Sequence, residues 1–342
     1  MTIYTLFRTF LFKLDPEFIH QLTLKLIHIA GEIKPINGFL CHLFFVPAKP
    51  VQAFGLNFTN PIGLAAGYDK DGIGWQGLAC LGFGHIEIGT VTPKPQPGNP
   101  KPRIFRLTEE KALINRMGFP GLGEEFVKKQ ILRPRPKNLV LGINIGKNKD
   151  TPLEAAEQDY LQLLRSFAPH ADYLAINISS PNTIGLRRLQ ERQALDALMR
   201  QVKTERERLL LSIPNNPPVL VKLSPDLSDG ELDDILAVLL ANNIDGVIAT
   251  NTTITRDGVH SHHASETGGL SGIPLFSKSL EMVEKIHHHT GDRLPVIGVG
   301  GIFNATSVQK MLDAGAVLVQ LYTGLIYEGP GLVKKILHDI QK

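Results

Sequence analysis

The chain has 342 residues, of which 43% are hydrophobic and 20% charged, an ordinary globular composition with room for one or two domains. A formal net charge of +3 without a long basic run does not indicate a nucleic-acid partner. The two cysteines, Cys41 and Cys80, share no motif spacing, so we expect neither a disulfide framework nor a zinc site, and a reducing compartment is favoured.

The N-terminus combines short apolar segments with little charge. No apolar run reaches the roughly 18–20 residues that a membrane-spanning helix needs, and no signal-peptide cleavage site follows the first apolar stretch. Asp15 and Pro16 indicate a break between two helices, and the second helix is expected to end at Gly31. Two interpretations stay open, an interfacial membrane foot or a helical hairpin packed on its own domain. The first helix is predicted from Ile3, Leu6, Phe7, Phe10, Leu11 and Leu14.

Beyond residue 50 the chain repeats one pattern, in which a short apolar run ends in a polar or Gly-rich turn and a longer helical segment follows. This alternation indicates parallel strands joined by right-handed crossovers. Eight such units predict an α/β fold, a (β/α)8 TIM barrel with an N-terminal helical hairpin extension, and an open doubly wound sheet is the alternative. The runs lie at residues 61–67, 85–92, 139–146, 173–179, 218–224, 246–253, 295–302 and 316–324.

The run at 173–179 raises the question of function, because its alternating apolar residues pass directly into amides and hydroxyls without any charge. In such a barrel the active site lies at the carboxyl ends of the strands, where all eight run ends would meet. These ends supply neutral hydrogen-bonding groups and two lysines, a set that suits a planar heterocycle better than a metal. They include Gly67, Lys70, Thr90, Asn144, Asn177, Ser180, Lys222, Thr250, Asn251, Thr252, Gly300, Gly301, Tyr322, Thr323 and Gly324.

Several of these features have competing interpretations. The Gly-rich turns after the last two runs favour a phosphate site over tight turns without a ligand. Lys222 could stabilise an anion formed during a reaction, or pair with a carboxylate. Ser180 is a candidate proton acceptor, although the residues alone favour capping of the turn that leads into the next helix.

Other residues could suggest a metal or cofactor site, but their sequence context does not favour one. The histidine clusters at 260–263 and 287–289 lack nearby cysteine and aspartate ligands, so no metal is expected. Trp75 and Met117 are expected to pack rather than to contact a cofactor.

Over nearly its whole length the chain resembles the quinone-dependent, membrane-associated (class 2) dihydroorotate dehydrogenases. Two positions depart from the family pattern, Pro120, where asparagine is more usual, and Ile273, where a basic residue is common. Neither departure removes a named contact. The segments that carry the resemblance are "LDPEFIHQL", "NPIGLAAGYDKDG", "GFGHIEIGTVTPKPQPGNPKPRIFRL", "INRMGFPG", "LGINIGKNK", "INISSPNTIGLR", "LVKLSPD", "IATNTT", "GGLSGIPL", "IGVGGI" and "QLYTGLIYEGP".

The resemblance implies an FMN enzyme that oxidises dihydroorotate in pyrimidine biosynthesis. Its implied cofactor-binding positions are Ala66, Gly67, Tyr68, Asp69, Lys70, Thr90, Asn144, Asn177, Lys222, Thr250, Gly272, Gly301, Tyr322 and Thr323. Its implied substrate-binding positions are Lys70, Asn115, Arg116, Met117, Gly118, Phe119, Asn177, Asn182, Asn251 and Thr252. By the same resemblance Lys70 would supply a cation for a carboxylate, and the asparagines would match the amide edges of a pyrimidine.

The resemblance also assigns Ser180 as the catalytic base, a position at which the soluble class 1 enzymes have cysteine. It divides the chain into residues 1–46, a membrane-associating hairpin that forms the quinone entrance, and residues 47–342, the FMN-binding catalytic barrel. His20 and Arg106 match positions of the quinone tunnel. A monomer is expected, bound peripherally to the cytoplasmic face of a bacterial inner membrane and reoxidised by ubiquinone or menaquinone.

Two rival functions remain alternatives to the dehydrogenase. One is a phosphate-binding barrel lyase or isomerase without redox chemistry, which leaves the ring of amides and the hairpin unexplained. The other is a membrane-docked binding protein, which gives the polar strand ends no task.

Overall fold

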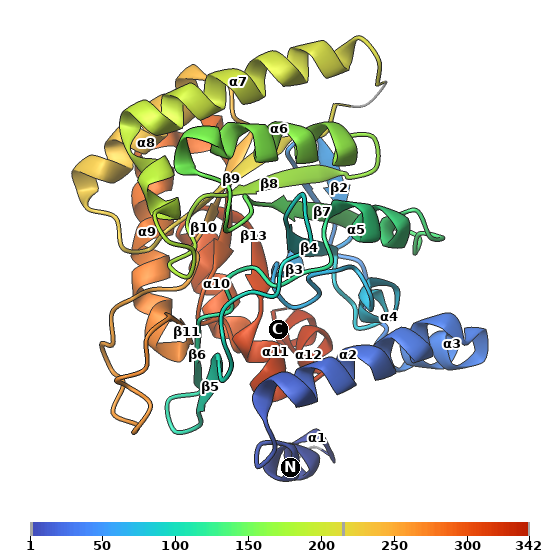
Figure 1. The fold of residues 1–342 in the computed structure, drawn as a ribbon. Helices are drawn as coiled ribbons and strands as arrows, with labels where there is room; N and C mark the ends of the chain where they lie inside the picture. Colours follow the sequence, from blue (N-terminus) through green and yellow to red (C-terminus); the bar gives the residue numbers. More distant parts are fainter. Residues whose placement is uncertain (1–2, 214–215, 341–342) are drawn as a thin grey trace.

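Eight parallel strands close into a barrel at the positions of the eight apolar runs, so the barrel prediction is confirmed and the open sheet is wrong (Figure 1). The computed structural model describes residues 3–213 and 216–340. Each strand pairs in parallel with the next barrel strand along the chain, and the last closes on the first. In order, the strands are β3 (Ile62–Leu64), β4 (His85–Val91), β7 (Val140–Ile145), β8 (Tyr173–Asn177), β9 (Val219–Leu223), β10 (Gly246–Ala249), β12 (Val296–Val299) and β13 (Ala316–Leu321).

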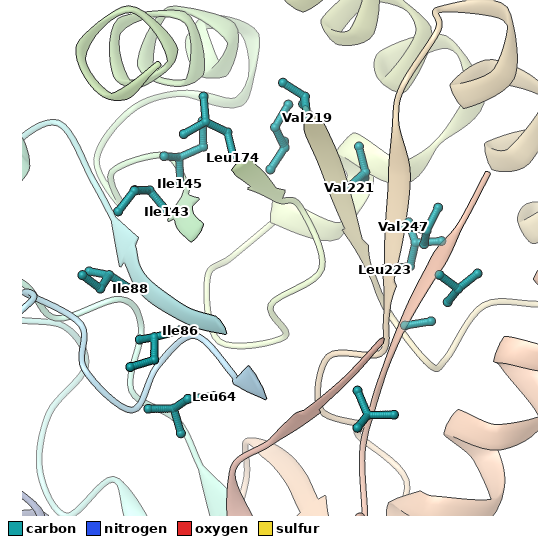
Figure 2. Close-up of a cluster of buried hydrophobic side chains, with 14 of the residues drawn as sticks. Leu64, Ile86, Ile88, Ile143, Ile145, Leu174, Val219, Val221, Leu223 and Val247 are labelled. Carbon is teal, nitrogen blue, oxygen red and sulfur yellow. The ribbon is translucent and has the colours of Figure 1, made fainter. Parts of the chain in front are cut away.

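The main core lies between this barrel and the helices around it, where alternate strand residues such as Ile86, Ile88, Ile143 and Ile145 are fully buried (Figure 2). Trp75 packs within the same core, as expected. The surrounding helices are α4 (Trp75–Ala79), α5 (Glu124–Ile131), α6 (Ala156–Phe167), α7 (Arg192–Leu210), α8 (Asp229–Ala241), α9 (Phe276–Thr290), α10 (Ala305–Asp313), α11 (Thr323–Glu328) and α12 (Leu332–Asp339).

Two small antiparallel sheets lie outside the predicted pattern. The hairpin of β1 (Val51–Ala53) and β2 (Leu56–Phe58) packs Phe58 against side chains from the amino ends of the barrel strands. A three-stranded sheet joins β5 (Ile104–Leu107), β6 (Ala112–Asn115) and β11 (Gly269–Gly272). It brings together segments that are about 150 residues apart in the chain.

Three helices precede the barrel, where the sequence predicts two: α1 (Ile3–Leu11), α2 (Pro16–Glu32) and α3 (Lys34–Leu43). Asp15 caps α2 as expected, since its Oδ1 accepts a hydrogen bond from the Phe18 N–H at 2.8 Å. The predicted end at Gly31 is wrong, because α2 continues to Glu32. A Cβ at Gly31 would lie 2.8 Å from the Gly77 nitrogen, so this glycine permits close approach of α2 to α4.

The cysteine prediction is also wrong, because Cys41 and Cys80 form a disulfide. Cys41 lies on the unpredicted α3 and Cys80 directly follows α4. The pairing depends on how α2 and α3 fold back onto α4, so the sequence separation of 39 residues contained no signal of it. Within the described residues, no helix combines the length and apolar character needed to cross a membrane.

Candidate active site

The carboxyl ends of the barrel strands surround one cavity with about 1000 Å³ of empty space, including its open mouth. The cavity therefore lies where a barrel of this class places its chemistry. Of the residues predicted for the site, it is lined by Ala66, Gly67, Lys70, Thr90, Asn115, Met117, Gly118, Phe119, Asn177, Ser180, Asn182, Lys222, Thr250, Asn251, Thr252, Gly272, Gly301, Tyr322 and Thr323.

Four of the residues predicted to bind the cofactor or the substrate do not line the cavity. Tyr68 is buried behind it, edge-on to Tyr322. Asp69 accepts hydrogen bonds from the Ile73 and Gly74 N–H groups, both at 2.8 Å, and so anchors the turn that leads into α4. Asn144 hydrogen-bonds to Thr90 and Asn177, and these two residues line the cavity. The side chain of Arg116 turns away and pairs with Glu266 at 2.6 Å.

Asn177, the last residue of β8, is the centre of a buried network of amides and hydroxyls. Its Nδ2 donates to Thr90 Oγ1 at 2.9 Å and to Asn144 Oδ1 at 3.2 Å. Its Oδ1 accepts from Asn251 Nδ2 at 3.3 Å, and Thr90 Oγ1 donates to Asn144 Oδ1 at 2.5 Å. Because these residues lie at or next to the carboxyl ends of β4, β7, β8 and β10, the network fixes four strand ends relative to one another. It answers the question raised by the polar end of the run at 173–179.

The two serines after β8 have different environments. Ser179 belongs to the network, since its Oγ donates to Asn177 and accepts from Asn251 Nδ2 at 2.9 Å. Ser180 lines the cavity, and its Oγ accepts from the Asn182 N–H at 3.2 Å. This hydrogen bond caps the turn after β8, as the capping interpretation of Ser180 expects, although the next helical segment begins only at Leu186.

Lys222 on β9 lines the cavity and is buried. Within residues 3–213 and 216–340 no carboxylate lies within 4 Å of its ammonium group, so the direct salt bridge considered for it is not formed. Burial lowers the pKa of Lys222, and the charge of Glu87 opposes that shift. The side chain therefore offers the cavity a cation that no close anion in the described residues neutralises.

Glu87 is a buried residue that the sequence analysis missed. From the middle of β4 it accepts hydrogen bonds from Asn144 Nδ2 at 2.8 Å, Tyr173 Oη at 2.9 Å and Gln320 Nε2 at 2.8 Å. A lone carboxylate inside the apolar run "HIEIGTVT" was the available signal, because a buried charge needs partners. Glu87 supports Asn144 from inside the barrel and supplies the charge nearest to Lys222.

Lys70 provides a second cation at the mouth. Its Nζ donates to the Gly67 carbonyl at 2.6 Å. Burial lowers the pKa of Lys70 to about 8, while Asp71 and Glu17 raise it. The cavity can therefore offer an ammonium group to an anionic ligand at neutral pH.

The part of the cavity formed by the turns after β12 and β13 is rich in glycine. Gly300 and Gly301 both have positive φ, and a Cβ at Gly301 would lie 2.5 Å from Phe276 Cβ, so the chain needs glycine there. Thr323 and Gly324 form the first turn of α11, whose N–H groups have no partner within the helix. Both turns line the cavity, which gives it a set of backbone donors suited to phosphate.

His20 and Arg106 lie between the N-terminal helices and the barrel. The His20 ring is edge-on to Tyr68, with centroids 5.0 Å apart, and burial lowers the pKa of His20 to about 4. Arg106 on β5 donates to the carbonyls of Phe12 and Leu14, and its guanidinium lies 4.7 Å from the centre of the Phe12 ring. His20 therefore contacts Tyr68, which packs against Tyr322, whereas Arg106 contacts the end of the segment around α1.

The histidine clusters contribute nothing to this cavity. In the part of the chain that the structure describes, no group of three or more histidine, cysteine, aspartate or glutamate residues is placed to hold a metal ion. His263 instead contacts the rings of His262 and Phe105.

Fold and site together define an α/β-barrel enzyme whose single mouth combines uncharged donors, two lysines and a phosphate-suited glycine turn. Comparison with known sequences is more specific, since the family model described as dihydroorotate dehydrogenase matches residues 50–342. The chain belongs to the dihydroorotate dehydrogenase family.

Full-length relatives agree with this assignment. The chain is 48% identical over 342 residues to a dihydroorotate dehydrogenase (quinone) of Vibrio parahaemolyticus, covering 99% of this chain and all of that one. It is 49% identical to the dihydroorotate dehydrogenase (quinone) of Burkholderia thailandensis, over 100% and 98% of the two chains. Among solved structures, DHODH from Eimeria tenella in complex with ferulenol superposes with a TM-score of 0.86 at 37% identity, over 95% of this chain and 90% of that one.

Proposed function

We propose that this protein oxidises (S)-dihydroorotate to orotate in the de novo synthesis of UMP, and that a membrane quinone is the final electron acceptor. The observation that carries the proposal is the gathering of Ser180, Lys222, Lys70 and the asparagine network around one cavity. The full-length relatives named for the quinone-dependent reaction support it. No observation favours a lyase or isomerase.

The cavity suits FMN as the resident cofactor. A tight Gly-rich turn and the first turn of α11 would hold its phosphate, and Lys222, free of any close anion in the described residues, would face the electron-rich ring. Bound there, FMN would supply hydride acceptance from carbon six of dihydroorotate and electron release to quinone. The residues assigned to it are Ala66, Gly67, Lys70, Thr90, Asn177, Lys222, Thr250, Gly272, Gly301, Tyr322 and Thr323, with Tyr68, Asp69 and Asn144 in support.

The substrate would lie between two polar loops of the mouth, residues 115–119 and residues 180–183. Lys70 offers its ammonium group to the substrate carboxylate, while Asn177 and Asn251 offer amides to the pyrimidine edges. Asn182 Nδ2 donates to Asn115 Oδ1 at 3.2 Å, which joins the loops across the cavity. The assigned substrate residues are Lys70, Asn115, Met117, Gly118, Phe119, Asn177, Asn182, Asn251 and Thr252, with Arg116 contributing its backbone.

Ser180 would remove the proton from carbon five of dihydroorotate. Its Oγ accepts one hydrogen bond, from the Asn182 N–H, which fixes the hydroxyl beside the cavity without occupying all of its acceptor capacity. A free hydroxyl is a weak base, so its action depends on exclusion of bulk water, and Ser180 is only 5% exposed.

Residues 1–46 would form the membrane contact and quinone entrance, and residues 47–342 the catalytic barrel. Most exposed large apolar side chains of the described residues lie in this N-terminal segment, where contact with a membrane surface would cover them. His20 and Arg106 would contact the quinone. The protein would act as a monomer on the cytoplasmic face of a bacterial inner membrane. The exposed large apolar residues of the N-terminal segment are Leu6, Phe7, Phe10, Leu14, Phe18, Leu22, Leu26, Ile29, Ile33, Ile36, Phe39, Leu43 and Phe45.

The visible spectrum tests the proposal directly. Purified protein should be yellow with FMN absorbance, dihydroorotate should bleach it under argon, and a short-chain ubiquinone should restore the colour. A folded, colourless protein that binds no FMN would refute the proposal. A yellow protein that dihydroorotate does not bleach would refute the assigned substrate.

A further inference from the structure

A buried ion pair attaches the first turn of α2 to the barrel. Glu17 is 6% exposed and accepts from Arg103 Nη2 at 2.7 Å and from Arg103 Nε at 3.1 Å. Lys101 reaches the same carboxylate at 3.3 Å, but its side chain is 62% exposed. A bidentate pair between two buried groups fixes geometry more strongly than an exposed contact does.

Arg103 also shapes the loop that precedes β5. Its Nη1 donates to the carbonyl of Pro97 at 2.7 Å and to the carbonyl of Asn99 at 2.8 Å. Gly98 has a φ of +76°, and a Cβ there would lie 2.7 Å from Arg103 Nη1 and 2.4 Å from the Met117 carbonyl. The loop is thus packed between the ion pair and the residues of the cavity.

Asn99 continues this chain of contacts to both substrate loops. Its Nδ2 donates to the Arg116 carbonyl at 3.0 Å and to the Asn182 carbonyl at 3.1 Å, and its N–H donates to the Met117 carbonyl at 2.9 Å. One amide therefore bridges the segment 115–119 and the segment 180–183, which face each other across the cavity.

We propose that Glu17 is a positioning residue for dihydroorotate, acting through Arg103 and Asn99. The N-terminal helices would then complete the substrate site as well as any membrane and quinone contact. Without the Glu17 carboxylate, Arg103 would keep a buried charge with no partner, and its hydrogen bonds to the 97–99 loop would shift to relieve it. Looser substrate loops lower substrate affinity, while Lys222 stays on β9 and Ser180 stays at the end of its segment that joins β8.

The inference rests on the proposed function, and Glu17→Gln tests it in the full-length holoenzyme. We expect the dissociation constant for dihydroorotate, from anaerobic stopped-flow bleaching, to rise about tenfold, as for a loss of one charge-assisted contact. The limiting bleaching rate should change less than the affinity does, because Lys222 lies on β9 and Ser180 lies where its segment joins β8, away from the contact between Asn99 and the Asn182 carbonyl. Orotate titration of the oxidised flavin should show the same loss of affinity.

Glu32→Gln is the matched control. Glu32 ends the same helix and also pairs with an arginine of the barrel, Arg133, but neither residue contacts a substrate loop. We expect wild-type affinity for dihydroorotate in this variant. Equal dissociation constants for Glu17→Gln and Glu32→Gln would overturn the inference. So would a Glu17→Gln variant altered only in its limiting rate.

Asn99→Ala decides the matter if Glu17→Gln does not fold, since it leaves the ion pair intact. A rise of the same size in the dissociation constant supports the chain of contacts, and wild-type affinity overturns it. Where both variants fold, the double variant should lose no more affinity than the larger single effect. A wild-type protein that dihydroorotate fails to bleach would refute the proposed function, whereas a bleached wild type with unaltered variants would refute only this inference.

Discussion

The barrel mouth and the N-terminal helices depart from the usual distribution of polarity in opposite directions. At the mouth, Asn144, Asn177 and Lys222 are no more than 5% exposed, although all three are polar. On the helices, Phe7 is 63% exposed and Phe10 is 66% exposed. Buried polar groups and exposed large apolar groups are both unfavourable, so each indicates a demand other than folding.

The two regions differ in how this unfavourable free energy is offset. At the mouth, hydrogen bonds within the chain satisfy the amides, as the contacts of Asn177 show, so the site is organised before any ligand arrives. On the helices, within the described residues, the large apolar side chains stay exposed, as the proposed membrane contact requires. The mouth is therefore preorganised by its own hydrogen bonds, whereas the helices present an apolar surface.

The largest effect is expected from Ser180→Ala at the mouth. Loss of a general base costs roughly 10²- to 10⁴-fold in the rate of the proton-transfer step. Anaerobic bleaching by dihydroorotate should slow by that factor while the bound flavin, read from its absorbance, is retained. Bleaching at the wild-type rate would show that another group removes the proton. Ser179→Ala is the comparison, and it should affect dihydroorotate affinity more than rate.

Lys222→Met should have the next largest effect. Lys222 is a buried cation without a close anion in the described residues, and loss of one such electrostatic group costs about 10²- to 10³-fold in rate. Methionine preserves the length of the side chain but not its charge. Bleaching should slow accordingly, and the reduction potential of the bound flavin should become more negative. A variant with wild-type rate and potential would remove Lys222 from the mechanism.

The sequence predicted the barrel well and the surrounding contacts less well. Parallel strands buried on both faces are continuous apolar runs, so all eight could be located by composition and by the turns that follow them. The sheet of β5, β6 and β11 could not, because its four-residue strands pair only through tertiary folding. Gly31 indicated a helix end but serves a helix contact, since a local pattern cannot distinguish the two.

The site shows the same division. Ser180, Lys222 and Asn177 were predictable because each follows or ends a barrel strand. Glu87 and Gln320 were missed, because their importance lies in a contact between β4 and β13 that no spacing reveals. Arg116 was predicted to bind the substrate, but its side chain pairs with Glu266 outside the cavity. Only its backbone lies in the loop assigned to the substrate.

The exposed apolar side chains of α1 make a weaker but separable prediction. Changing Phe7 and Phe10 together to serine removes two exposed rings, each worth up to about 1.5–3 kcal/mol when buried. Binding to vesicles of phosphatidylethanolamine and phosphatidylglycerol should fall by about tenfold or more, measured by sedimentation.

Leu211→Ser provides the control for this prediction. Leu211 is 90% exposed and directly follows α7, a helix at the opposite end of the molecule from α1 (Figure 1). It should bind vesicles as the wild type does. If the two changes weaken binding equally, the membrane contact is not specific to the N-terminal helices, and the contrast between the two regions loses its meaning.

The smallest effect concerns pH. Burial lowers the pKa of Lys70 to about 8, against Asp71 and Glu17, which raise it. Lys70 is cationic below that value and neutral above it, so affinity for the orotate carboxylate should fall as pH rises through 8. An approximately tenfold rise in the orotate dissociation constant is expected between pH 7 and 9 in flavin absorbance titrations. His20, whose pKa burial lowers to about 4, is neutral throughout this range.

The variant Lys70→Met tests whether Lys70 is the group whose titration changes the affinity for orotate. The variant should bind orotate weakly, with a dissociation constant that no longer changes across the same pH range. If wild type and variant lose affinity in parallel as pH rises, the titrating group is elsewhere, and Lys70 holds its loop through the Gly67 carbonyl rather than the substrate. That outcome would leave the mouth with a single functional cation, Lys222, and would make its amides the main determinant of substrate affinity.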